Sequence, residues 1–84
     1  MTRIEIYGRD GCSYCDRAKL LCEFRNYPFV YRNTTVEPSL LDEMFRRSPN
    51  AKTFPQIFIG HRLIGGYDDL VKLSKLEIQQ MIGD

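Results

Sequence analysis

The pattern of hydrophobic and polar positions changes from a strand period to a helix period early in the chain. Within residues 3–7, Ile4 and Ile6 alternate with charged side chains, as expected for a half-buried strand. Over residues 13–25 the hydrophobic positions recur at helical spacing, with charged residues on the opposite face. Turn-forming residues occupy positions 8–11 between them. The pattern therefore predicts a strand followed directly by a helix.

The rest of the chain predicts three further strands and two further helices. Residues 29–31 are aromatic and β-branched, and they read as a strand parallel to the first, reached by a right-handed crossover. An amphipathic helix is predicted over residues 40–47, after a proline suited to a first helical turn. Residues 56–59 and 62–64 read as an antiparallel hairpin. A last helix over residues 68–82 completes the order βαβαββα, an α/β fold with one four-stranded mixed sheet and three helices.

Length and charge narrow the class of protein. The 84 residues predict a single domain, residues 1–84, with a modest core. No hydrophobic run reaches the ~18 residues of a membrane span. The net charge of +1, with both signs well mixed, argues against nucleic acid or an anionic membrane as the main partner. The first residues lack the apolar block of a signal peptide, so we expect a cytoplasmic protein in a reducing compartment.

Two cysteines, Cys12 and Cys15, lie three residues apart where the first strand leads into the first helix. In a βαβ pattern this spacing is a redox signature. The positive end of a helix lowers the pKa of a thiol placed there, and the thiolate is the nucleophile. Arg9, just upstream, adds a cation. We therefore expect Cys12 to attack a disulfide and the more covered Cys15 to resolve the mixed disulfide.

A structural pair and a metal site are the alternatives to redox chemistry. By count alone, Cys12, Cys15, Cys22 and His61 make a Cys3His zinc set. However, Cys22 lies seven residues beyond Cys15 on one helix, about 10 Å along its axis, whereas zinc–sulfur bonds are about 2.3 Å. We therefore predict that Cys22 fills the core and that His61 is a solvated residue in a hairpin turn.

Three motifs together resemble the glutaredoxin family. They are C-S-Y-C at residues 12–15, T-F-P-Q-I-F-I-G at residues 53–60 and G-G-Y-D-D-L at residues 65–70. The resemblance implies a thioredoxin-like fold and glutathione-dependent reduction of protein disulfides and glutathione mixed disulfides. It implies glutathione as co-substrate, no resident metal, disulfide-containing client proteins and a monomer. Ribonucleotide reductase is a candidate client. Thioredoxin itself is disfavoured because the chain has no Trp.

The same resemblance assigns roles to individual residues. Cys12 matches the nucleophile and Cys15 the resolving thiol. The residues that match a glutathione-binding groove are Arg9, Tyr14, Lys52, Thr53, Phe54, Pro55, Gly66, Tyr67, Asp68 and Asp69. Pro55 matches the family's cis-proline, and the Phe54 backbone would pair with an extended glutathione as an added strand does.

For the charged residues of this set, an ordinary structural role is an alternative to glutathione binding. Asp68 and Asp69 match the segment that holds the γ-glutamyl end of glutathione, and they also suit the start of a helix. Arg9 and Lys52 suit the glycine carboxylate of glutathione, or serve only as solvated cations.

Ser13 departs from the family's commonest motif, which has Pro at that position. Its N–H and hydroxyl can both stabilise a Cys12 thiolate. Some glutaredoxins without that Pro hold a [2Fe–2S] cluster between two protomers, with glutathione thiols as co-ligands. A cluster carrier is therefore the second class of function, although the usual carrier motif C-G-F-S is absent.

Overall fold

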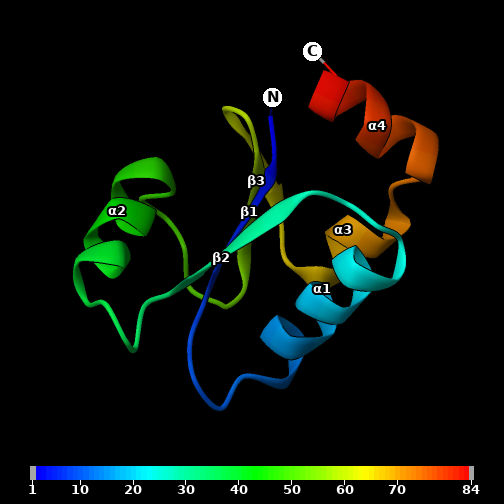
Figure 1. Cartoon of the computed structure of the whole chain (residues 1–84). Coiled ribbons are helices and arrows are strands. Elements are labelled where there is room, and N and C mark those ends of the chain that lie inside the picture. The colour runs from blue at the N-terminus through cyan, green and yellow to red at the C-terminus, as the bar shows by residue number, and fades with distance from the viewer. Residues whose placement is uncertain (1, 84) are drawn as a thin grey trace.

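Four strands form one mixed sheet in the order β2-β1-β3-β4 in the computed structural model, which describes residues 2–83 (Figure 1). The elements in chain order are β1 Ile4–Gly8, α1 Ser13–Phe24, β2 Phe29–Asn33, α2 Ser39–Arg47, β3 Gln56–Ile59, β4 Arg62–Gly65, α3 Tyr67–Lys72 and α4 Lys75–Gly83. β1 pairs with β2 in parallel, and β3 pairs antiparallel with both β1 and β4. The predicted sheet, with its parallel first pair and its hairpin, is confirmed.

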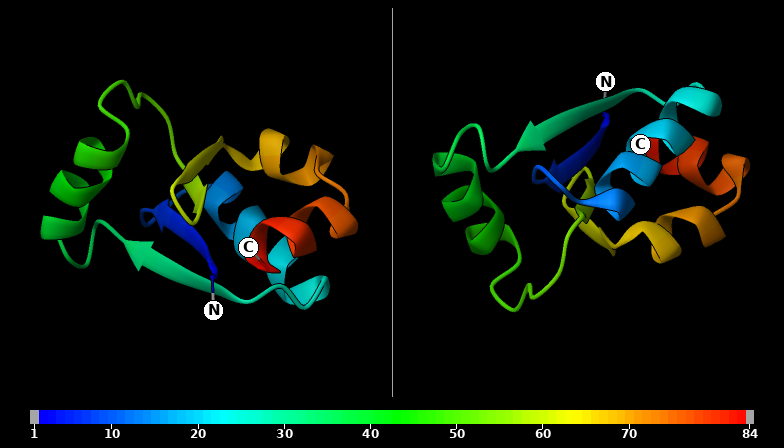
Figure 2. Two further views of the ribbon diagram at one scale, coloured as in Figure 1. Left: turned by 90° about the horizontal axis from the view of Figure 1, so that it is seen from above. Right: turned by 90° about the horizontal axis from the view of Figure 1, so that it is seen from below.

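The helices cover both faces of the sheet unequally. Figure 2 shows α1, α3 and α4 on one face and α2 alone on the other. The alternation in β1 accounts for this, because Ile4 and Ile6 join the core under α1 whereas Tyr7 belongs to the smaller cluster with Met44 of α2. None of the helices within residues 2–83 is long and apolar enough to cross a membrane.

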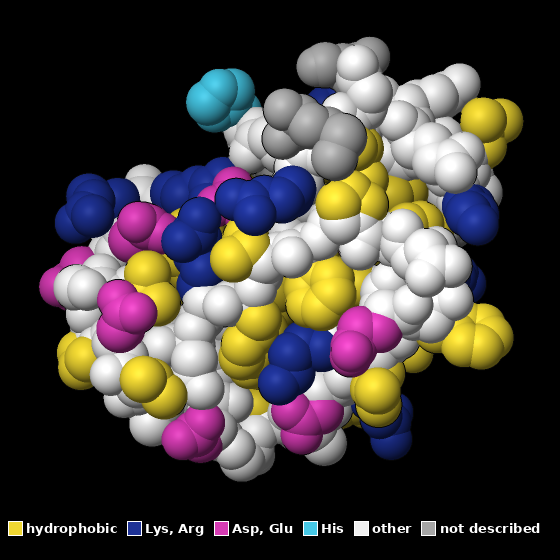
Figure 3. Space-filling model, viewed as in Figure 1, with side chains coloured by type: hydrophobic (Ala, Val, Ile, Leu, Met, Phe, Trp, Pro, Cys, Tyr) yellow, Lys and Arg dark blue, Asp and Glu magenta, His cyan; other side chains and the backbone are white. Residues whose placement is uncertain are grey.

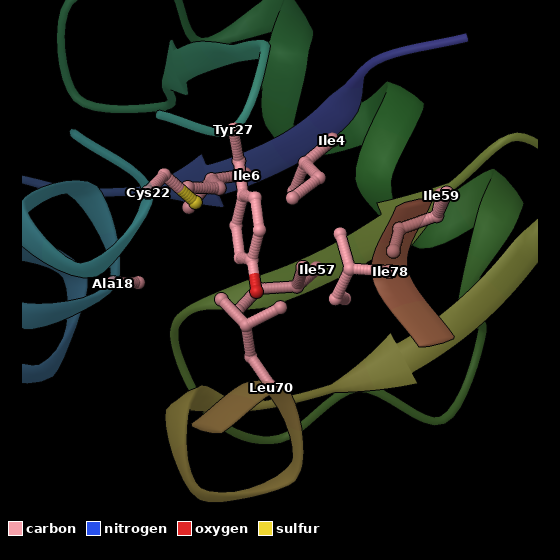
Figure 4. Packing of buried hydrophobic residues seen from close by; sticks show 9 residues of the cluster. All are labelled: Ile4, Ile6, Ala18, Cys22, Tyr27, Ile57, Ile59, Leu70 and Ile78. Carbon is pink, nitrogen blue, oxygen red and sulfur yellow. The ribbon is translucent and has the colours of Figure 1, made fainter. Parts of the chain in front are cut away.

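The main core lies between the sheet and the three helices on its larger face. Figure 4 shows its side chains converging from β1, β3, α1, α3 and α4. Its buried members are Ile4, Ile6, Ala18, Cys22, Tyr27, Ile57, Ile59, Leu70 and Ile78. Burial of one such Leu or Ile side chain contributes about 1.5–3 kcal/mol to the free energy of folding. The core therefore fixes α1, and with it the two cysteines, against the sheet.

The segment predicted as one last helix forms two helices, α3 and α4. The fold therefore has four helices within the described residues, rather than the predicted three. α3 ends at Lys72, and Leu73 adopts an extended conformation with ψ of 133°. Ser74 then starts α4 through reciprocal hydrogen bonds with Glu77: Ser74 Oγ accepts from the Glu77 N–H at 3.1 Å, and Glu77 Oε1 accepts from the Ser74 N–H at 3.0 Å. The predicted inward face still holds, because residues of both helices pack on the core.

Charged side chains join α2 to the opposite face of the sheet. Glu5 of β1 pairs with Arg32 of β2 at 3.1 Å and with Arg47 of α2 at 3.0 Å. The Tyr7 hydroxyl donates to Glu43 and accepts from Arg47, and burial is the main cause of the raised pKa of Tyr7. Figure 3 shows Lys and Arg side chains gathered with acidic ones in the upper left, on the side of α2. Arg47 thus joins α2 to the sheet through Glu5 and Tyr7.

Candidate active site

The local backbone places Cys12 at the beginning of α1. Gly11 has φ of +71°, in the left-handed region that favours glycine, and it completes the turn after β1. Cys12 is the N-cap residue of α1, and its Sγ accepts a hydrogen bond from the Cys15 N–H at 3.2 Å. The sulfur thus occupies the place of a capping oxygen, next to the positive end of the helix. This is the position that the sequence predicted for the attacking thiol.

Cys12 and Cys15 are joined by a disulfide and differ in exposure. Their Cα atoms lie 5.2 Å apart. Cys12 retains 9% of its surface in contact with solvent, whereas Cys15 is fully buried. Cys12 is therefore the more exposed residue of the pair. This difference in access supports the expected division between an attacking and a resolving thiol.

The turn before Cys12 is held by the end of β2. Because Gly8 pairs with Asn33 in the parallel register, the residues after each strand lie side by side. The Asn33 side-chain amide donates to Asp10 Oδ1 at 2.8 Å, and the Asp10 N–H donates to Thr35 Oγ1 at 3.0 Å. Thr34 donates to the Gly8 carbonyl through both its N–H and its hydroxyl. These contacts were not predicted, because they depend on the strand register.

Three side-chain and backbone contacts bring the predicted groove segments together. The Arg9 guanidinium lies 4.9 Å from the centre of the Phe54 ring. Just before α3, Gly66 lies close to Pro55: a Cβ added to Gly66 would lie 3.8 Å from the Pro55 carbonyl oxygen. The rings of Tyr14 and Tyr67 are 6.1 Å apart at their centres. The segment around the cysteines, the segment before β3 and the start of α3 therefore border one another.

The remaining residues predicted to form the groove differ in burial and in their contacts. The Phe54–Pro55 peptide bond is cis, as expected, and Pro55 is buried. The Thr53 carbonyl accepts a hydrogen bond from Gln56 Nε2 at 2.8 Å. Lys52 and Asp68 are exposed, without a side-chain hydrogen bond or ion pair to any of residues 2–83. Contacts with the described residues therefore leave both charges available to a ligand.

Arg17 belongs to the surroundings of the cysteines, although the sequence did not single it out. Its guanidinium lies 5.0 Å from the centre of the Tyr14 ring. Tyr14 is itself about half exposed, so the pair forms part of the outer surface next to Cys12. The signal was present in the sequence, because residues three apart on a helix share a face.

The alternative zinc set is not assembled. Cys22 is buried in the core, as predicted, and desolvation raises the pKa of its thiol to about 12. His61 is exposed in the turn between β3 and β4, as predicted. Within residues 2–83 there is no group of three or more His, Cys, Asp or Glu side chains placed to hold one metal ion.

Comparison with known proteins agrees with this geometry. The glutaredoxin family model matches residues 4–64. The chain is 40% identical to glutaredoxin 3 of Escherichia coli K12 over 74 residues, which cover 88% of each protein. The solution structure of glutaredoxin from Brucella melitensis has a TM-score of 0.74 and 41% identity, with 100% of this chain and 94% of that chain covered.

A more distant structure has the same fold. The buckwheat glutaredoxin–glutathione complex has a TM-score of 0.69 at 20% identity, with 98% of this chain and 77% of that chain covered. The family match and the similarity to curated glutaredoxins agree with the Cys12–Cys15 pair at the start of α1. The chain belongs to the glutaredoxin family and is a thiol-disulfide oxidoreductase.

Proposed function

We propose that this glutaredoxin uses glutathione to reduce protein disulfides and glutathione mixed disulfides. The observation that carries the proposal is the position of Cys12, the more accessible cysteine, at a helix start bordered by the predicted groove segments. A positive helix end favours the thiolate, and the buried Cys15 lies in bonding distance behind it. The arrangement suits attack from outside followed by resolution from within.

The proposed reaction transfers two electrons to the client. The Cys12 thiolate attacks one sulfur of the client disulfide, so that bond breaks, a mixed disulfide forms, and the departing thiolate takes up a proton. The Cys15 thiolate then attacks Sγ of Cys12 and releases the second client thiolate, which is also protonated. The product is the Cys12–Cys15 disulfide present in the structure. Two glutathione thiols then reduce that disulfide and become glutathione disulfide.

Glutathione is the proposed co-substrate because the groove offers complementary groups. The exposed Asp68 carboxylate suits the ammonium group of the γ-glutamyl end, and Arg9 and Lys52 suit the glycine carboxylate. The backbone of Phe54 offers the peptide edge along which an extended tripeptide would pair. The buckwheat relative, whose fold this chain shares, was solved as a complex with glutathione. Tyr14 and Tyr67 would flank the ligand.

The proposals for the client proteins and for the cellular compartment rest on the sequence alone. Ribonucleotide reductase is proposed as one client, from the family resemblance. A reducing compartment, the cytoplasm, is proposed as the place of action, because the reaction needs a supply of reduced glutathione.

A coupled assay tests the proposed electron donor. The protein is given the mixed disulfide of glutathione and 2-mercaptoethanol, and NADPH oxidation is followed with glutathione plus glutathione reductase, or with thioredoxin reductase alone. The proposal predicts rapid turnover in the first system and little in the second. Turnover only with thioredoxin reductase would contradict it.

The cluster-carrying alternative has its own test. It requires Cys12 of two copies to share one [2Fe–2S] cluster with two glutathione thiols. After anaerobic reconstitution with iron, sulfide and glutathione, the thiol-exchange proposal predicts a colourless monomer. A brown dimer would assign the second function as well.

A further inference from the structure

Hydrophobic side chains are exposed along the outer face of α1, beyond the two cysteines. Leu20 is 64% exposed and Phe24 is 88% exposed. Together with Arg17, Leu21 and Tyr67 they line one shallow hollow of about 520 Å³. Figure 3 shows hydrophobic groups projecting from the side of the molecule that carries α1, α3 and α4. We call these five residues the α1 shelf.

The shelf is continuous with the redox site. Tyr67 lines the hollow and also lies against Tyr14, one of the two residues between the cysteines. Arg17 lines the hollow and stacks on the same Tyr14 ring. At about 100° per residue, Tyr14 and the shelf residues of α1 fall within an arc of about 120° on the helix. The shelf therefore begins beside Tyr14, next to the cysteines, and continues along α1.

Distance places the shelf within the area that a bound protein would cover. Phe24 is twelve residues beyond Cys12, which is about 18 Å along a helix of 1.5 Å rise per residue. Even a small transient interface buries several hundred square ångströms on each partner. A protein whose disulfide reaches Cys12 is therefore large enough to cover part or all of the shelf at the same time. A small mixed disulfide does not reach it.

We propose that the α1 shelf is a docking surface for protein clients, one that selects a segment with aliphatic or aromatic side chains about six residues from the reacting disulfide. This inference rests on the proposed reduction of protein disulfides. The spacing follows because six extended residues span roughly 20 Å, slightly more than the ~18 Å from Cys12 to Phe24 along α1. Arg17, at the inner end of the shelf, favours a carboxylate in the same client segment. The shelf thus determines which protein disulfides are reduced, and the cysteines determine the chemistry.

Two synthetic peptides test the proposal. Each contains one intramolecular disulfide followed by a seven-residue tail with one Glu, and the tails differ only in having two Leu or two Ser at positions five and six. The wild-type protein is expected to reduce the Leu-tail peptide with a kcat/KM on the order of tenfold higher, because exposed Leu side chains of the tail are buried against the shelf. The double substitution L20S/F24S is expected to abolish this preference while leaving the rates with the Ser-tail peptide and with the glutathione–mercaptoethanol mixed disulfide unchanged.

A matched control separates the shelf from general surface hydrophobicity. Leu76 of α4 is 63% exposed, nearly the same as Leu20, and does not line the hollow. Leu76→Ser is expected to keep the full preference for the Leu-tail peptide. Circular dichroism checks the fold of each variant. Should L20S/F24S be misfolded, competition with a disulfide-free Leu-tail peptide on the wild-type protein replaces it, and inhibition is expected only against the Leu-tail substrate.

Several results would overturn the proposal. They are equal kcat/KM for the two peptides with the wild-type protein, a preference that survives L20S/F24S, an equal loss in Leu76→Ser, and no inhibition by the disulfide-free Leu-tail peptide. A concentration-dependent dimer in sedimentation, dissociated by Phe24→Ser, would instead assign the shelf to a second copy of the chain. Failure to reduce any of the three substrates would overturn the proposed function itself, and the docking surface with it.

Discussion

The Asp69 carboxylate accepts a hydrogen bond from the Gly66 backbone N–H at 3.0 Å and thereby supports the first turn of α3. Its neighbour Asp68 is exposed and makes no side-chain hydrogen bond to the part of the chain that the structure describes. Both acids were predicted to bind glutathione, and both suited a helix start. The structure gives the capping role to Asp69 and leaves the Asp68 carboxylate available to a ligand.

Substitution of the two acids should therefore have different effects. Asp68→Ala is expected to raise the apparent KM for glutathione more than it lowers kcat, because it removes a partner of the ligand's ammonium group. Asp69→Ala is expected to lower the free energy of unfolding by about 1 kcal/mol, because the Gly66 N–H loses its partner. Steady-state kinetics of both variants measures the effect on the KM for glutathione, and urea unfolding measures the effect on stability. An unchanged glutathione dependence in Asp68→Ala would remove that residue from the site.

The hydrogen bond from Asn33 to Asp10 should act on the reactivity of Cys12. It holds the turn that sets the direction of the Cys12 side chain, and its length of 2.8 Å indicates a well-formed bond. Asn33→Ala is expected to slow alkylation of reduced Cys12 roughly two- to tenfold, the equivalent of one hydrogen bond of about 0.5–1.5 kcal/mol. Stopped-flow alkylation at neutral pH measures this rate.

A double-mutant cycle provides the control for this pair. If the two side chains act as a unit, Asp10→Ala combined with Asn33→Ala should be no slower than either single variant. Fully additive effects would show that Asn33 acts through its other hydrogen bonds, to the N–H groups of Thr35 and Val36.

Features encoded by nearby residues were predictable from the sequence, and those that depend on the sheet were not. The periodicity around Ile4 and Ile6 predicted β1, and the C-x-x-C spacing predicted the cysteine pair. The contact of Asn33 with Asp10 requires the parallel register of β1 and β2, which no local pattern specifies. The proximity of Gly66 to Pro55 likewise requires β3 and β4 to fold back on each other.

The division of the last helix was missed for a different reason. Its hydrophobic positions keep a helical spacing through the break, since Leu70 of α3, Leu73 between the two helices and Ile78 of α4 all pack on one core. A polar pattern marks the break, with Ser74 followed three residues later by Glu77. Periodicity identifies the buried face, whereas the caps decide where one helix ends and another begins.

The start of α4 should be sensitive to its cap. Ser74→Ala removes the oxygen that accepts from the Glu77 N–H, and we expect it to lower the free energy of unfolding by about 1 kcal/mol. Ser74→Thr keeps the acceptor and serves as the control, with a smaller loss. Chemical denaturation of the three proteins measures the difference. Equal stability of Ser74→Ala and wild type would show that core packing alone holds α4.

The buried thiol of Cys22 should make the fold sensitive to alkali. Its pKa is raised to about 12 by desolvation, so the unfolded chain loses this proton at a lower pH than the folded protein does. The stabilising contribution of the neutral thiol is complete below the ordinary thiol pKa of about 8.5 and is lost as the pH rises towards 12. The loss reaches at most about 1.4 kcal/mol per pH unit in that window.

Comparison with Cys22→Ala isolates this contribution, because the tyrosines with raised pKa values are present in both proteins. The stability advantage of the wild type over Cys22→Ala at pH 7 is expected to shrink steadily between pH 9 and pH 10.5. Urea unfolding across that range measures it. A constant advantage would mean that Cys22 does not stay protonated in the fold.

The roles of the two active-site thiols underlie the whole account. Cys12 caps α1 and is the more accessible, and Cys15 is buried behind it. The most direct measurement is the rate at which Cys12→Ser and Cys15→Ser reduce a glutathionylated peptide in the glutathione and glutathione reductase assay. Cys12→Ser is expected to be inactive, and Cys15→Ser to retain much of the wild-type rate, because a second glutathione can release the product. An active Cys12→Ser together with an inactive Cys15→Ser would contradict the assignment.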